Sequence, residues 1–428
     1  MLGIFLETSP MFTTIRSLAS ALLLVLLAGS SAHAEKLVLT VASFPDLDRA
    51  AKAATAAWSR LHPDIELRIV SRQYADHHTA MTTALATGSG LPDVMAVDMR
   101  FIGKFADSGG LEDLRAAPYD GMALRARFAP YTFPQAIGHG GALVAIPADI
   151  GPGTLLYRKD LADKAGVTEA DLTRDWESYI AAGRKIKAAT GTYLLADAGD
   201  LRDIALRSGL KDGEGIYFDG AGRCLVESPR FVRAFELGRE VRQAGLDAKA
   251  TAWSNEWAAD FKQGRIASQM MGAWLTGHLK NWLAPDNAGR WRSAALPGGL
   301  YASYGGSFYA IPAKADHKQA AWEFIRFMTT NKEIQLNSLR ALDSFPALNE
   351  ALQDRVMDEP VAYLGGQKAR LLWRDIAAHV PSIAVNRLDA TATDVIRDEF
   401  EKVVSEGKAI PVALADAREL IEHRARRR

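Results

Sequence analysis

Short apolar segments with the character of strands alternate with amphipathic helices along most of this chain, and that alternation limits its fold more than any other feature. The first helix, for example, places Trp58 and Leu61 on one apolar face at helical spacing. The pattern predicts an α/β fold in which helices cover both faces of a parallel sheet. The expected strands cover residues 36–41, 65–69 and 93–97, and the expected helices cover about 51–61 and 77–87.

The second half of the chain continues the pattern. Ser228 followed by Pro229 is a typical helix start, and Gly191, Gly245 and Gly264 are expected to end helices. Neither a low-complexity linker nor a repeat of fixed period separates the elements. Domains without a tether are usually joined by strands that cross between them, and ligands then bind where strand ends face the crevice. The expected helices cover about 176–190, 229–244 and 255–263, and the expected strands cover 192–196 and 265–271.

The amino-terminal residues have the order of a secretory signal peptide. Arg16 precedes the apolar stretch 18–28, which is followed by Ala32 and Ala34 around a predicted cleavage site. A run of about 11 apolar residues is too short to span a bilayer, which requires roughly 20. No cysteine lies close after it to accept a lipid. We therefore expect a periplasmic protein that is cleaved after Ala34, soluble and not lipid-anchored.

Charge and motif content argue against several classes of function. The chain has 51 Lys and Arg against 51 Asp and Glu, so it does not predict a nucleic-acid surface. The sequence contains no phosphate loop, no zinc-binding His-Glu-x-x-His and no Gly-x-Ser-x-Gly elbow. His77 and His78 are adjacent, and adjacent side chains diverge, so they do not predict a metal site. No cofactor, metal or catalytic residue is expected.

Four blocks of sequence, in this order and spacing, resemble one family of proteins. Together they are similar to the extracellular solute-binding proteins of family 1, the maltose- and trehalose-binding type, over nearly all of the mature length. The blocks are LPDVMAVD with FADSGGL at 91–98 and 105–111, DIG with LLYRKDL at 149–151 and 155–161, FKQGR with MGAW at 261–265 and 271–274, and GGS with AAWEFI at 305–307 and 320–325.

This resemblance implies a periplasmic-binding-protein fold, in which two discontinuous α/β lobes are joined by a hinge of crossing strands with a ligand cleft between them. Residues 1–34 would be the signal peptide. Residues 35–147 and 311–343 would form the first lobe, and residues 148–310 and 344–428 the second.

The resemblance also implies a function. The chain would be a monomeric periplasmic receptor that captures a mono- or oligosaccharide and delivers it to the membrane subunits of an ABC importer by hinge closure. Ser307 stands where many relatives have tryptophan, and His379 lies where relatives often carry sugar-binding arginine and tyrosine. A glycerol phosphate or another polar sugar derivative is therefore an alternative ligand. A secreted carbohydrate-active enzyme and a sensor or chemotaxis receptor are the alternatives from other classes.

A sugar has polar hydroxyl edges and flat apolar faces, so its receptor needs carboxylates and an aromatic ring. Asp98 and Asp149 are expected at strand ends, where each carboxylate can accept hydroxyl hydrogen bonds. Trp274 follows a strand between Gly272 and Gly277, a position suited to a stacking platform. The structural alternatives are helix capping or solvation for the aspartates and core packing for the tryptophan. Further candidates for ligand binding are Ser43, Phe44, Asp46, Arg72, Tyr157, Gly305, Gly306, Ser307 and His379.

Overall fold

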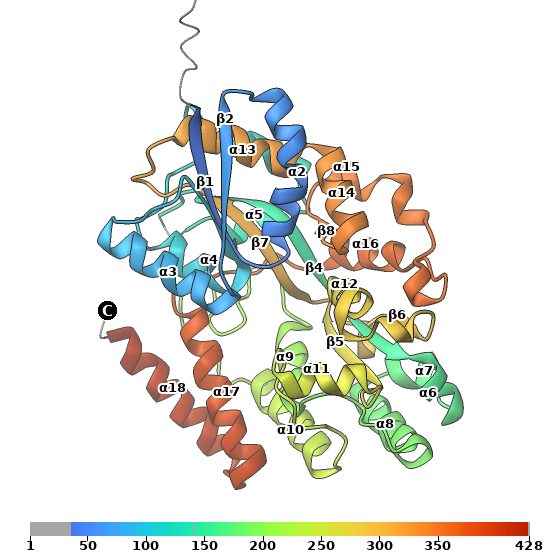
Figure 1. Cartoon of the computed structure of the whole chain (residues 1–428). Coiled ribbons are helices and arrows are strands. Elements are labelled where there is room, and N and C mark those ends of the chain that lie inside the picture. The colour runs from blue at the N-terminus through green and yellow to red at the C-terminus, as the bar shows by residue number, and fades with distance from the viewer. Residues whose placement is uncertain (1–35, 139, 427–428) are drawn as a thin grey trace, which may run out of the picture.

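The computed structural model describes residues 36–138 and 140–426 (Figure 1). The predicted signal peptide and its cleavage site lie outside these residues. Within them, no helix combines the length and the apolar character needed to cross a membrane.

The described residues form a mixed eight-stranded sheet in which β2, β1, β3, β7, β4 and β5 lie in that order. The strands β6 and β8 pair with β4 beside this path. Figure 1 shows β4 and β7 running from the upper half of the molecule towards the lower half. The strands are β1 (Leu37–Ser43), β2 (Ile65–Ser71), β3 (Val94–Asp98), β4 (Ala145–Arg158), β5 (Ser268–Gly272), β6 (Trp291–Ala294), β7 (Ser303–Ala310) and β8 (Phe345–Pro346).

The prediction of a parallel sheet is only partly correct. β1 pairs in parallel with β2 and with β3. β7 is antiparallel to both β3 and β4, and β5, β6 and β8 are antiparallel to β4. The antiparallel partners of β3 and β4 come from much later in the sequence, so the local alternation of strands and helices did not reveal them.

β4 changes partners along its length. Its first part pairs with β7 and β8, whereas residues 153–158 pair with β5 and β6. The register with β7 shifts twice, between Pro147 and Asp149 and between Ile150 and Pro152. At Gly151 an added Cβ would lie 2.1 Å from the backbone oxygen of Tyr304, so only glycine fits this close approach of the two strands.

The five helices that the sequence predicted are present, with ends that differ by a few residues. Gly191 adopts the left-handed conformation directly after a helix, as predicted, and Gly88 does the same after the helix predicted over about 77–87. The first helices are α2 (Leu47–Leu61), α3 (Tyr74–Thr87), α4 (Met99–Ala106), α5 (Thr132–Gln135), α6 (Lys159–Lys164), α7 (Glu169–Thr173), α8 (Trp176–Thr190) and α9 (Ala198–Arg207). They are followed by α10 (Pro229–Gln243), α11 (Asn255–Lys262), α12 (Leu275–His278), α13 (Lys318–Thr330), α14 (Lys332–Leu342), α15 (Asn349–Leu352), α16 (Ala369–His379), α17 (Asp389–Glu406) and α18 (Ile410–Arg426).

The strand predicted over residues 192–196 is wrong. In its place Tyr193 makes an isolated bridge with Ile266, and Leu195 makes another with Asp247. The side chains of Leu194 and Leu195 are nevertheless buried, which explains their strand-like apolar character.

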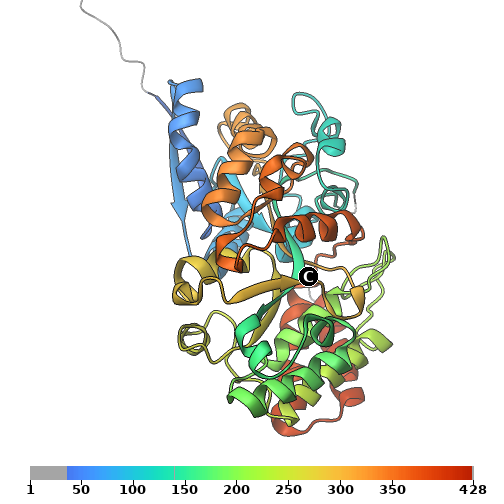
Figure 2. The ribbon, with the colours of Figure 1, turned by 90° about the vertical axis from the view of Figure 1, so that its right-hand side faces the viewer.

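Segments distant in sequence pack side by side. α13 contacts α2 in the upper half, and α17 and α18 contact α10 in the lower half (Figures 1 and 2). Buried side chains form two clusters, one around β1, β3 and β7 and one around α8 to α10 with α17 and α18. The first cluster also contains Trp257, Trp291 and Trp373, which come from segments assigned to the second lobe. The two clusters therefore do not coincide with the two predicted lobes, and the lobe boundary stays a prediction.

Candidate functional site

Two of the predicted carboxylates meet on either side of one residue of β7. Ser307 is paired with Asp98 of β3 on one side and with Asp149 of β4 on the other. Burial is the main cause of the raised pKa of Asp149, and the charge of nearby Asp98 raises it further. We call this arrangement the carboxylate pair.

Asp98 lies at the end of β3, as predicted, and it also caps α4. Its carboxylate accepts hydrogen bonds from the backbone amide of Arg100 and from the hydroxyl of Tyr74, both at 2.8 Å. Its own amide donates to Nε2 of His78 at 3.1 Å. Burial raises the pKa of Asp98 above its ordinary value in spite of these hydrogen bonds. Asp98 thus has the helix-capping role that was the structural alternative to ligand binding. Its Oδ1 accepts both hydrogen bonds.

Asp149 does not lie at a strand end, which corrects the prediction. It lies within β4, at the point where β4 pairs with both β7 and β8. Ser344 donates a hydrogen bond to its carboxylate at 3.1 Å. Burial raises the pKa of Asp149 to about 6, because desolvation outweighs the hydrogen bonds from Ser307 and Ser344. A small cavity lined in part by Ala148 and Ser344 lies beside it.

Trp274 is held at the other end of the same stretch of β7. Its indole Nε1 donates a hydrogen bond to the backbone oxygen of Tyr304 at 2.8 Å, and the side chain is half-buried. A Cβ at Gly272 would lie 2.1 Å from that nitrogen, and one at Gly305 would lie 2.7 Å from it. The two glycines therefore make the space in which the indole lies. Gly305 and Gly306 also have positive φ angles of 85° and 134°.

Sequence reasoning missed Trp253, the most exposed large aromatic side chain among the described residues near this site. Its ring stacks on that of Trp274 with centroids 5.9 Å apart and planes 22° apart. The side chain is 53% exposed, and the backbone adopts a φ of 74°, which is strained for a residue other than glycine. The residue lies in a loop without periodicity, so no local pattern indicated it.

Asp46, in the first loop of the chain, contacts a set of rings formed by Trp253, Trp274 and His278, which we call the aromatic group. Nε2 of His278 lies 2.9 Å from the carboxylate of Asp46, and the indole nitrogen of Trp282 donates to Nδ1 of the same ring at 3.0 Å. Because Nδ1 accepts, the proton of a neutral ring lies on Nε2 and is donated to Asp46. The ring of His278 also packs edge-on against Trp253 and Trp274.

The remaining candidates lie in several places. Ser43 and Phe44 are buried, and the Phe44 ring packs edge-on against Tyr74. Arg72 is exposed beyond the end of β2. Tyr157 is buried in the second cluster, where its hydroxyl donates to Glu169 at 2.9 Å. His379 ends α16 and stacks on Tyr301 with centroids 4.8 Å apart. The structure thus brings Asp98, Asp149, Ser307, Gly305, Gly306 and Trp274 together along β7 and does not bring Tyr157 to them.

Among residues 36–138 and 140–426, no group of three or more His, Cys, Asp and Glu side chains is arranged to hold a metal ion. The polar groups along β7 are hydroxyls, carboxylates and backbone amides, which suit hydrogen bonding to a neutral polar ligand.

Residues 42–335 match the family described as bacterial extracellular solute-binding protein. The chain belongs to this family. Among curated relatives, the lactose-binding protein of Rhizobium radiobacter is 27% identical over 80% of this chain and 83% of its own length. The maltotriose-binding protein of Pyrococcus abyssi is 29% identical over 71% of this chain and 65% of its own length.

Solved structures of similar fold are also solute-binding proteins. A crystal structure of an extracellular solute-binding protein of family 1 superposes with a TM-score of 0.78 at 23% identity, covering 90% of this chain and 99% of the other. An ABC transporter-associated binding protein from B. animalis subsp. lactis, in complex with β-1,6-galactobiose, gives a TM-score of 0.74 at 23% identity, with 90% and 97% covered. The predicted two-lobed α/β fold of this solute-binding protein is thereby confirmed.

Proposed function

We propose that this solute-binding protein captures a sugar and delivers it to an ABC importer. The observation that carries the proposal is the joint placement of the carboxylate pair and Trp274 along residues 303–307 of β7. Carboxylates accept hydrogen bonds from hydroxyl groups, and an indole face contacts the apolar face of a sugar ring. The names of the lactose- and maltotriose-binding relatives support the same ligand class.

The proposed mechanism is hinge closure without covalent chemistry. The two lobes would move about the strands β4 and β7, which continue from one half of the molecule to the other, and ligand contacts to both lobes would favour the closed form. The importer would then recognise that form. We place this cycle in the periplasm, after export directed by the predicted signal peptide.

The test is a thermal-shift screen of the mature protein with lactose, maltotriose, galactobiose, glucose, galactose, galacturonate and glycerol 3-phosphate. A ligand that binds only the native state increases the unfolding free energy by about 2.7 kcal/mol when its concentration is a hundred times the dissociation constant. The melting temperature rises as a result. We expect at least one neutral sugar to give a shift that calorimetric titration confirms. A shift with glycerol 3-phosphate alone would favour the phosphorylated alternative, and no shift with any sugar would contradict the proposal.

A further inference from the structure

We infer that Arg207, at the end of α9, is a ligand-binding residue that donates hydrogen bonds to oxygen atoms of a neutral sugar held against Trp274. This inference rests on the proposed function and names a contact that sequence reasoning did not find.

The guanidinium of Arg207 lacks the partners that comparable arginines have. Among the described residues its buried Nε has no hydrogen-bond partner, and the guanidinium lies over an aromatic ring. Arg202, which precedes Arg207 on the same helix, is 5% exposed and bonds Asp203 at 2.6 and 2.8 Å. Burying a cation without a partner is costly, so such a group is expected where a ligand supplies the acceptor.

Arg207 is connected to Trp274 through Tyr304, which lies next to both side chains. The guanidinium carbon is 4.7 Å from the centroid of the Tyr304 ring, and the backbone oxygen of Tyr304 holds the indole of Trp274. The ring centroids of Tyr304 and Trp274 are 6.4 Å apart. Tyr304 lies on the stretch of β7 that leads to Ser307 and the carboxylate pair. Arg207 therefore brings hydrogen-bond donors close to the carboxylate pair, whose own groups are acceptors.

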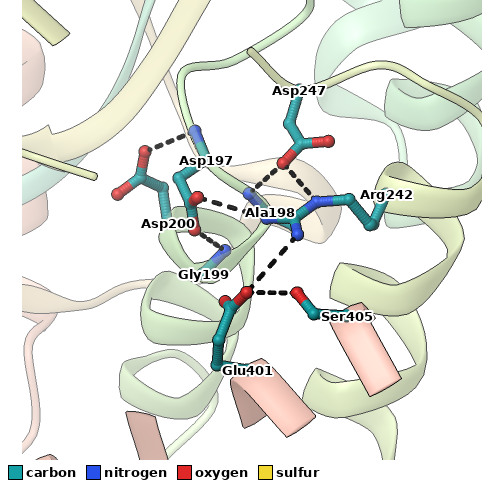
Figure 3. A network of polar contacts seen from close by, with 8 residues as sticks. All are labelled: Asp197, Ala198, Gly199, Asp200, Arg242, Asp247, Glu401 and Ser405. Atoms are coloured by element: carbon teal, nitrogen blue, oxygen red, sulfur yellow. Dashed lines mark hydrogen bonds and ion pairs between the residues drawn. The ribbon is translucent and has the colours of Figure 1, made fainter. Parts of the chain in front are cut away.

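α9 is fixed firmly at its opposite end (Figure 3). Asp197 caps the helix by accepting from the amide of Gly199 at 2.7 Å, and Asp200 completes the capping box. Arg242 bonds both Asp197 at 3.2 Å and Asp247 at 2.7 Å, and Asp247 accepts from the amide of Ala198. This network holds α9 in place, so the position of Arg207 is set by the helix and does not depend on a loop.

The charges around Arg207 favour a neutral ligand over an anionic one. Burial lowers its pKa, but nearby Tyr304, Tyr217, Asp203 and Asp98 raise that pKa above its ordinary value. The carboxyl group of Asp389 is also close enough for the charge of Arg207 to act on it. A carboxylate or phosphate bound here would face the carboxyl groups of Asp203 and Asp389 in addition to the carboxylate pair. Hydroxyl and ring oxygens accept from a guanidinium without bringing a further negative charge.

The experiment compares Arg207→Met with Arg202→Met, a matched control on the same helix that also lies over an aromatic ring, Phe400. Melting temperatures are measured without ligand, and dissociation constants are measured for each neutral sugar that binds the wild type. We expect R207M to melt within about 2 °C of the wild type and R202M to melt several degrees lower. We expect R207M to weaken sugar binding at least about tenfold, and R207K to weaken it less.

The outcomes separate the two proposals. If the wild type binds no sugar in the screen, the proposed function fails and this inference fails with it. If the wild type binds a sugar and R207M binds it equally well, the inference alone is overturned. A fall in the melting temperature of R207M as large as that of R202M, without weaker binding by the folded protein, would show that Arg207 is structural. Tighter binding of galacturonate than of galactose would overturn the preference for a neutral ligand.

Discussion

Trp274 owes its position to two residues that have no side chain. Gly272 and Gly305 leave the volume that the indole occupies, and the carbonyl of Tyr304 fixes the direction of the ring. One face of the ring stacks on Trp253. The orientation of a potential sugar platform is thus decided by backbone geometry on β5 and β7.

Replacing Trp274 with alanine should weaken sugar binding by roughly 1–3 kcal/mol, the scale of a lost large apolar contact. The half-buried ring also bonds Tyr304, so some stability should be lost as well. Trp257→Ala is the control, because Trp257 is fully buried and its loss should cost about 3–5 kcal/mol of unfolding free energy. Titration calorimetry and melting curves on both variants measure these effects. Unchanged binding by folded W274A would assign Trp274 to the core.

Asp149→Asn should change stability in a pH-dependent way. The pKa of Asp149 is about 6 in the folded protein, above the usual value of about 3.9 for an unfolded chain. The folded state therefore retains this proton while the unfolded state loses it, and the group reduces stability as pH rises from about 4 to about 6. Asparagine removes that cost, so D149N should raise the unfolding free energy at pH 7.5, by up to about 3 kcal/mol, and have little effect at pH 4. Urea unfolding at both pH values is the measurement, and an equal effect at both would contradict the assignment.

At the scale of elements, α9 depends on a buried ion-pair network at its start. Arg242→Met would leave the carboxylate of Asp247, whose side chain is 0% exposed, without its partner. We expect a loss of about 3–5 kcal/mol in unfolding free energy. Arg184→Met is the control, because Arg184 and Glu240 form a pair in which both side chains are about half exposed, and such pairs contribute about 0–1 kcal/mol. Similar losses in the two variants by chemical denaturation would refute this role of Arg242.

Elements whose signals are local could be predicted from sequence, and those that depend on distant partners could not. Gly88 and Gly191 end helices because the left-handed conformation is inexpensive for glycine, which is a property of one residue. Residues 192–196 are apolar because they are buried, but they meet their neighbours at single bridges and not along a ladder. From the sequence alone, an apolar run that pairs along a strand ladder cannot be distinguished from one that is buried without such pairing.

The same limit applies to the site. Asp98 and Trp274 were identified from their neighbours in sequence and from a family resemblance. The pairing of Asp98 and Asp149 around Ser307 requires the antiparallel placement of β7, which no local pattern indicates. Arg207 has the appearance of an ordinary cation in the last turn of a helix. Only the absence of a hydrogen-bond partner for its buried Nε, among the residues that the structure describes, distinguishes it.

At the scale of the whole molecule, side-chain contacts join segments assigned to different lobes. Arg100 of α4 bonds Asp394 of α17 at 2.6 Å, and His278 of α12 contacts Asp46 before α2. If the predicted lobes are correct, both contacts cross between them. The Arg100–Asp394 contact lies near the carboxylate pair, and the His278–Asp46 contact lies near the aromatic group. Movement of the lobes would therefore change the surroundings of the carboxylate pair and of the aromatic group.

Small-angle X-ray scattering tests that movement. Hinge closure about β4 and β7 should reduce the radius of gyration when a saturating sugar identified by the thermal screen is added. Galactose or glucose that gave no thermal shift serves as the control for added solute. A radius that stays the same despite confirmed binding would contradict closure, or would show that the ligand-free protein is already closed.

The exposed side chain of Trp253 gives this protein an intrinsic fluorescence signal near the proposed site. An indole that is half exposed to water emits at longer wavelength than a buried one, and a ligand lying over it would exclude that water. The stacked neighbour Trp274 would respond at the same time. The chain therefore carries its own optical reporter beside the proposed site, and unlabelled protein could report ligand occupancy by a change in tryptophan fluorescence.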